Sequence, residues 1–160
     1  HPRYAISPEL RPGVGDWLFG CDICQDVCPW NRFAPNETLP EFEHLSSMNP
    51  VNCRELLTLS ADQFETRFRD SPLSRPGRAG LLRNAAIVLG NAQDPYAEPA
   101  LVAALADPES MIRGAAAWAL GRIGTSTAVS AIRDRRAVEN DESVRLEIDD
   151  ALRSFRDQSC

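Results

Sequence analysis

The fold of this chain is decided by Leu82-Arg83-Asn84-Ala85-Ala86-Ile87-Val88-Leu89-Gly90, the first copy of a repeating helical pattern. Its Ala-Ala and Leu-Gly pairs return 31 positions later as Ala116-Ala117 and Leu120-Gly121. A period in this range, with two helices in each unit, is typical of an α-solenoid built from stacked helical hairpins. The sequence therefore predicts a mainly α-helical protein in which residues 80–156 form a short solenoid.

Polar breaks separate the expected helices of the solenoid. Asp94-Pro95 and Asp107-Pro108 lie at two of these breaks, where Asp can cap a helix and Pro can open one. Upstream, Ser60-Ala61-Asp62-Gln63 has the form of a capping box, and Ser71-Pro72 should end the helix that the box begins. We therefore expect residues 37–79 to form connecting helices and turns.

Cysteines dominate the Pro- and Gly-rich residues 1–36. The run Cys21-Asp22-Ile23-Cys24-Gln25-Asp26-Val27-Cys28-Pro29 reads C-x2-C-x3-C-P. The bacterial ferredoxin signature is C-x2-C-x2-C-x3-C-P, and its fourth Cys binds the other cluster of a pair. The first Cys position of that signature falls on Leu18, which cannot bind iron. The run predicts a ferredoxin-like segment in which Cys21 and Cys24 bind one [4Fe–4S] cluster and Cys28 binds a second.

A structural zinc site is the alternative for these cysteines. Its fourth ligand would be Cys53 or His44, although zinc sites usually pair C-x2-C with a second close pair of ligands. Cys53 is otherwise most simply a small buried hydrophobic residue. Trp17, Phe19 and Trp30 flank the run, and we expect them to shield the clusters from water.

The composition limits the classes of function. The chain has 160 residues, a net charge of −6 and 17 basic residues, all of them Arg. No apolar run approaches the about 20 residues of a membrane span, and no signal peptide opens the chain. The sequence contains no P-loop, dinucleotide fingerprint or nucleophile–base pair. Because the chain begins at His1 and its cluster motif is incomplete, we expect it to be a piece of a longer polypeptide.

Five arginines gather within 17 residues around the turn at residues 71–74: Arg67, Arg69, Arg75, Arg78 and Arg83. Arginine, Ser hydroxyls and helix N-termini are common phosphate contacts, but a solvated basic face has the same composition. Composition alone favours the solvated face. An acidic cluster lies near the other end, and we interpret it as a solvated face: Glu139, Asp141, Glu142, Glu147, Asp149 and Asp150.

Three segments together resemble one enzyme family. The segment Gly20–Asn31, with its Cys-Pro-Trp-Asn ending, resembles the second cluster motif of epoxyqueuosine reductases. The segments Ser71–Arg75 and Leu82–Asn91 are similar to a later motif of that family, and the repeats that follow resemble its HEAT-like C-terminal domain. The resemblance implies a cytoplasmic bacterial enzyme that uses cobalamin and two [4Fe–4S] clusters to reduce epoxyqueuosine in tRNA to queuosine.

The resemblance also implies a tRNA partner. The HEAT-like part would help to hold the anticodon arm, with phosphate contacts on Arg75, Arg78 and Arg83 first. The cobalamin domain and the first cysteine motif of the family are not in this chain, so no catalytic residue is assigned and the segment should not catalyse alone. We expect a monomer; the electron donor protein is not identified.

Two other functions remain open. The first is an electron-transfer or protein-interaction module, in which a ferredoxin-like element is fused to a HEAT scaffold. The second is a scaffold stabilised by zinc.

Overall fold

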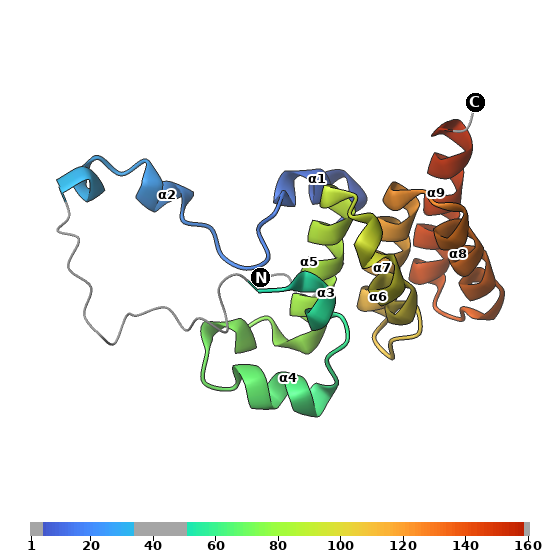
Figure 1. The fold of residues 1–160 in the computed structure, drawn as a ribbon, viewed down its shortest axis with the longest axis horizontal. Helices are drawn as coiled ribbons and strands as arrows, with labels where there is room; N and C mark the ends of the chain where they lie inside the picture. Colours follow the sequence, from blue (N-terminus) through green and yellow to red (C-terminus); the bar gives the residue numbers. More distant parts are fainter. Residues whose placement is uncertain (1–4, 34–50, 159–160) are drawn as a thin grey trace.

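The computed structural model describes residues 5–33 and 51–158, and every regular element within these ranges is a helix. The helices of the second half pack side by side into an elongated stack (Figure 1). No helix in the described ranges is long and apolar enough to cross a membrane. The mainly α-helical fold expected from the sequence is confirmed.

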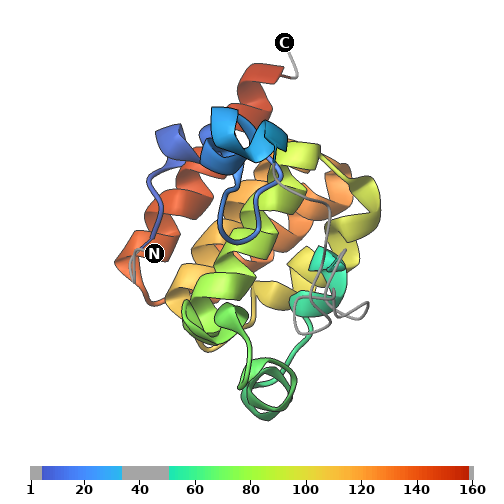
Figure 2. The same ribbon diagram turned by 90° about the vertical axis from the view of Figure 1, so that its left-hand side faces the viewer.

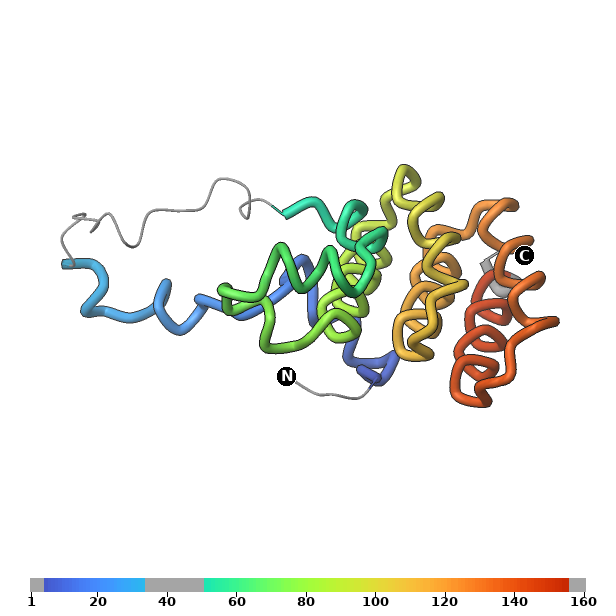
Figure 3. The backbone as a smooth tube through the Cα atoms, turned by 90° about the horizontal axis from the view of Figure 1, so that it is seen from below, coloured from blue at the N-terminus to red at the C-terminus, as the bar shows by residue number. Residues whose placement is uncertain are grey.

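The stack has two layers. The inner layer consists of α5 (Gly77–Ala92), α7 (Ser110–Ile123) and α9 (Glu142–Gln158), which follow one another along the long axis of Figure 3. The outer layer consists of α3 (Cys53–Leu56), α6 (Glu98–Ala104) and α8 (Ser126–Val138). Because α6 pairs with α7 and α8 pairs with α9, the helices form the stacked hairpins of the predicted solenoid.

Both expected Asp-Pro breaks end one helix and begin another. After α5, Gln93 adopts the left-handed conformation with φ 50°, and Asp94 Oδ1 accepts the N–H of Tyr96 at 2.9 Å. This bond caps the short helix η5 (Pro95–Ala97). Before α7, Asp107 Oδ1 accepts the N–H of Glu109 at 3.0 Å. Each Asp thus satisfies a backbone donor that has no partner within the helix.

Helix α4 (Ala61–Phe68) forms as the capping box predicts. Gln63 donates its backbone N–H to Ser60 Oγ at 3.2 Å, and Ser60 donates its own N–H to Gln63 Oε1 at 2.9 Å. Phe64 and Phe68 lie on one face, with ring centroids 5.2 Å apart, and both are buried. The helix ends before the Ser-Pro pair, as expected, and the short helix η4 (Pro72–Ser74) follows.

The repeated Leu-Gly pairs mark the points where inner helices approach most closely. A Cβ added to Gly90 of α5 would lie 2.9 Å from Ala119 Cα of α7. A Cβ added to Gly121 of α7 would lie 2.8 Å from Ala151 Cβ of α9. Real Cβ atoms essentially never come this close, so the repeat conserves a helix crossing that only glycine fits.

Two segments precede the stack. Residues 6–19, here called the strap, contain η1 (Pro8–Leu10) and α1 (Arg11–Val14), and α1 packs against α5. Residues 20–33, here called the arm, contain α2 (Ile23–Asp26) and η2 (Pro29–Phe33) and project from the stack (Figure 1). Figure 2 views the molecule from the arm end and shows the blue strap beside the inner layer.

Candidate functional site

The arm places the three cysteines of the ferredoxin-like run on consecutive turns. Cys21 lies just before α2, Cys24 lies within it, and Cys28 lies between α2 and η2. Asn31 donates its Nδ2 hydrogen to the carbonyl oxygen of Gln25 at 2.8 Å, which ties η2 back to α2. The arm therefore has a defined local structure of its own, made from backbone turns and this amide contact.

The thiols of the arm are free. Cys21 and Cys24 are exposed, and Cys28 is half-buried. Within residues 5–33 and 51–158, no three side chains of the types that bind metals converge on one point. Free thiols are the donors that iron–sulfur clusters require, so the arm fits a cluster as one part of a ligand set. That Cys21 and Cys24 bind one cluster and Cys28 binds another remains a prediction.

The alternative zinc ligand Cys53 lies elsewhere, at the start of α3. Its side chain packs against the core of the stack, and burial raises the pKa of its thiol. Burial therefore favours the neutral thiol, whereas metals bind the thiolate. Cys53 is partly buried and packs as a small hydrophobic residue, much as the sequence suggests. The other alternative, His44, lies outside the described residues.

Two of the three aromatic residues expected to shield the clusters are exposed in this chain, Trp17 at 41% and Trp30 at 83%, whereas Phe19 is partly buried against the stack. Their shielding of a bound cluster stays a prediction. Other apolar side chains of the arm are also exposed: Ile23, Val27 and Phe33. The arm extends away from the stack, so nothing in the described part of the chain packs over these side chains.

The three arginines expected to contact phosphate lie in different environments. Arg75, next to η4, has an exposed side chain. Arg78 donates its Nε hydrogen to the carbonyl oxygen of Leu59 at 2.8 Å and pairs with Asp107 of the next repeat. Arg83 is only 1% exposed. Of the three, Arg75 alone is an exposed residue; the Arg78 side chain is partly exposed and Arg83 is buried.

The burial of Arg83 corrects the expectation that it contacts phosphate. Its Nε and Nη2 hydrogens are donated to Asn84 Oδ1 at 3.1 and 2.8 Å, inside the protein. Burial lowers the pKa of Arg83, and the nearby charge of Arg11 lowers it further. Helix α5 packs against α3, α7 and the strap, and the Arg83 side chain is held among them rather than on the exposed surface.

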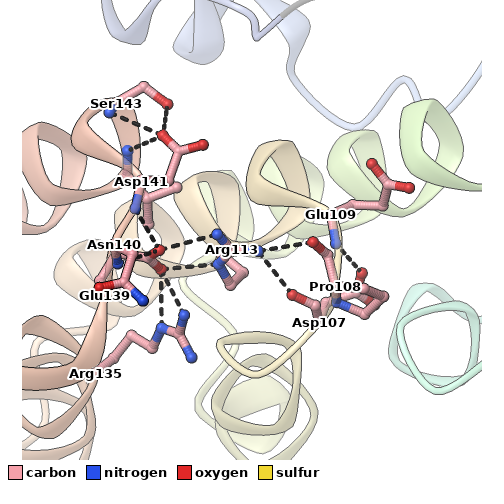
Figure 4. A network of polar contacts seen from close by, with 10 residues as sticks. Asp107, Pro108, Glu109, Arg113, Arg135, Glu139, Asn140, Asp141 and Ser143 are labelled. Carbon is pink, nitrogen blue, oxygen red and sulfur yellow. Dashed lines mark hydrogen bonds and ion pairs between the residues drawn. The ribbon is translucent and has the colours of Figure 1, made fainter.

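A buried ion pair, which no local sequence pattern indicates, links α7 to the turn after α8 (Figure 4). Glu139 is 3% exposed and accepts two hydrogen bonds from Arg113, at 2.8 and 2.9 Å. Arg135 donates a third bond at 2.9 Å. The N–H groups of Asn140 and Asp141 donate two more. One member of the supposedly solvated acidic cluster is therefore a structural carboxylate.

These donors set the charge of Glu139. The hydrogen bonds from Arg113 lower its pKa most, and burial opposes them. The Asp141 N–H and Arg135 lower it further, and the resulting pKa is about 2. The carboxylate is therefore charged throughout the physiological range. Arg113 also donates to the carbonyl oxygens of Asp107 and Pro108, so this pair fixes the turn before α7 as well.

Comparisons with known proteins identify the helical stack as HEAT repeats. A family model described as HEAT repeats matches residues 77–153. An epoxyqueuosine reductase from Pseudomonas aeruginosa is 43% identical over 122 residues, which cover 75% of this chain and 34% of the relative. Another from Bacillus subtilis is 34% identical over 148 residues, which cover 92% of this chain and 38% of the relative. The chain thus spans between a third and two fifths of the length of these relatives.

A solved structure extends the similarity to almost the whole chain. It is a crystal structure of an epoxyqueuosine reductase with a tRNA-Tyr epoxyqueuosine-modified stem loop. It matches with a TM-score of 0.90 and 31% identity, covering 97% of this chain and 42% of the other. The similarity therefore includes the strap and the arm as well as the repeats.

Proposed function

Because this chain belongs to the epoxyqueuosine reductase family and matches the C-terminal portion of its members, we propose that it supplies cluster ligands and a tRNA-facing helical surface to such an enzyme. The enzyme removes the epoxide oxygen of epoxyqueuosine in tRNA and leaves queuosine. The observation that carries this proposal is the match, over 97% of the chain, to a structure that holds a modified tRNA stem loop.

The arm is the proposed ligand-bearing part. Cys21 and Cys24 bind one [4Fe–4S] cluster, and Cys28 binds its neighbour. The other ligands, and the cobalamin, belong to the part of the enzyme that this chain does not span. When bound, the clusters supply electrons for the reduction. The role of this chain is to bind the clusters through thiolates and to orient them relative to the stack.

Serine substitutions test the ligand assignment in the complete enzyme, purified without oxygen. Cys21→Ser should remove one cluster, or about four of about eight irons, because a hydroxyl is a poor substitute for a thiolate. Adding Cys24→Ser should remove no more iron, whereas adding Cys28→Ser should remove the second cluster. Iron and sulfide analysis with visible absorption measures each loss.

Cys53→Ser is the matched control and should leave the iron content unchanged, because Cys53 packs in the stack. Equal iron in Cys21→Ser and Cys53→Ser would contradict the assignment. Stoichiometric zinc in a colourless wild-type enzyme would instead support the zinc-stabilised scaffold.

Arg75 is the proposed phosphate contact, because its side chain is exposed beside the turn that resembles the family motif. Arg75→Gln should weaken binding of the tRNA stem loop and lower the slope of log K against log salt by about 0.7–0.9, the effect of one lost phosphate contact. Arg133→Gln, an exposed position on α8, is the control. Equal slopes for both variants would favour a protein-docking module over a tRNA-facing surface.

A further inference from the structure

The strap crosses all three helices of the inner layer and is held at each of them. Its helix α1 packs on α5, and the Arg11 guanidinium carbon lies 5.2 Å from the ring centroid of Trp118 on α7. Arg11 also forms a two-bonded ion pair with Glu147 of α9, one bond of which is 2.9 Å long. Arg11 is 1% exposed, so its charge is buried together with its partner.

A chain of polar contacts fixes the end of the strap nearest the cysteines. Arg83 can only donate hydrogen bonds, so it turns the carbonyl oxygen of Asn84 toward itself. The amide nitrogen of Asn84 is therefore left facing the strap, where it donates to the carbonyl oxygen of Leu18 at 2.9 Å. Arg83 thus orients Asn84, and Asn84 anchors Leu18.

A second asparagine of α5 holds the middle of the strap. Asn91 Nδ2 donates to the carbonyl oxygen of Arg11 at 2.8 Å and to that of Gly15 at 3.0 Å. Both of its amide hydrogens are committed to strap carbonyls. Asn84 and Asn91 lie seven positions apart on α5, which is two helical turns, so both amides face the strap.

The anchored carbonyl is close to the first cysteine of the run. Cys21 follows Leu18 by three residues, so its Cα lies within about 11 Å of the Leu18 Cα however the chain is extended. A cavity of about 330 Å³ opens at this point, and its lining includes Trp17, Phe19, Cys21 and Asn84. The contacts of the strap therefore restrict where a cluster bound by Cys21 can sit.

We propose that Arg83, Asn84 and Asn91 are positioning residues that hold the strap on the HEAT stack and thereby set the location of the cysteine arm. The proposal rests on the cluster-binding function proposed above. Arg83 and Asn84 then serve a contact within the chain, in place of the phosphate contact expected of Arg83 from the sequence. The stack is then both a tRNA-facing surface and the support for the redox arm.

Asn84→Asp tests this in the complete enzyme, because it keeps the side-chain shape and the acceptor for Arg83 but loses the donor to Leu18. Amides of residues 13–20 should exchange with deuterium about tenfold faster, whereas amides of α7 and α9 should not change. The electron paramagnetic resonance spectrum and midpoint potential of the reduced clusters should shift. Asn91→Ala should act in the same direction, and Asn140→Ala, at an exposed loop position, should match the wild type.

Two results would overturn the proposal. Unchanged deuterium exchange at residues 13–20 in Asn84→Asp and Asn91→Ala would show that the two asparagine side chains do not hold the strap. Faster deuterium exchange of the strap, together with an unchanged paramagnetic resonance spectrum, midpoint potential and iron content, would show that the strap does not position the clusters. A wild-type enzyme without iron would instead refute the cluster-binding function, and the metal analysis reveals that before any variant is compared.

Discussion

Glu139→Ala should lower the free energy of unfolding by about 3–5 kcal/mol, because it removes one partner of a buried ion pair and leaves the other charged. The side chain of Arg113 is only 11% exposed and would lose both carboxylate contacts. The N–H groups of Asn140 and Asp141 would lose their acceptor as well. A loss of this size is a large part of the about 5–15 kcal/mol that stabilises a typical domain. Urea denaturation followed by circular dichroism measures it.

Glu142→Ala is the matched control for this substitution. Glu142 lies three residues away on the first turn of α9, and its side chain is 78% exposed with a single ion pair at 3.9 Å. Its loss should change the free energy of unfolding by about 0.5 kcal/mol or less. Similar losses for the two variants would show that the buried network contributes no more than surface charge does.

The same carboxylate predicts a pH dependence of stability. The pKa of Glu139 is about 2 in the folded chain and 4.5 when unperturbed. Its folded pKa is the lower one, so its contribution is complete above pH 4.5 and is lost as the pH falls toward 2. The lost contribution amounts to about 3 kcal/mol. The difference in stability between the wild type and Glu139→Gln should therefore shrink over this range; a difference independent of pH would contradict the low pKa.

The sequence predicted the helices well because their signals are local. The Asp-Pro breaks, the capping box at Ser60 and the Leu-Gly repeat each act within one turn or one helix. The Leu-Gly repeat also indicates where the inner helices pack, since each of its glycines lies at the crossing of two of them. The spacing of the three cysteines is an equally local signal, and the clusters that it predicts stay a proposal.

Contacts between distant segments were not predictable in the same way. Arg11 and Glu147 pair across 136 positions, and nothing near either residue indicates the other. The burial of Arg83 did leave a signal, because apolar residues surround it on every face of α5 and not on a single stripe. A helix that is apolar all round is buried, so an arginine in its middle is a structural residue before it is a ligand for phosphate.

Gly90→Val should destabilise the stack by about 3 kcal/mol or more, because α5 and α7 cannot stay at their present separation. An added Cβ would lie 2.6 Å from Trp118 Cζ3 and 2.9 Å from Ala119 Cα. The indole ring could turn aside, but the backbone atom of Ala119 could move only with its helix. The guanidinium groups of Arg11 and Arg122 both lie over the Trp118 ring, so displacing it would loosen the strap. Thermal and urea denaturation measure the loss.

Gly114→Ala separates this packing effect from the effect of glycine on helix propensity. Gly114 lies in α7, and a Cβ there would meet only the Glu147 side chain, at ordinary contact distances of 3.5 Å to Cγ and 4.0 Å to Cβ. Alanine should therefore stabilise the chain at this position by about 0.5–1 kcal/mol, since it forms helix better than glycine. Gly90→Ala should destabilise it despite the same gain. If both alanine variants proved more stable than the wild type, the close crossing of α5 and α7 would be wrong, because a tight crossing requires opposite signs at these two glycines.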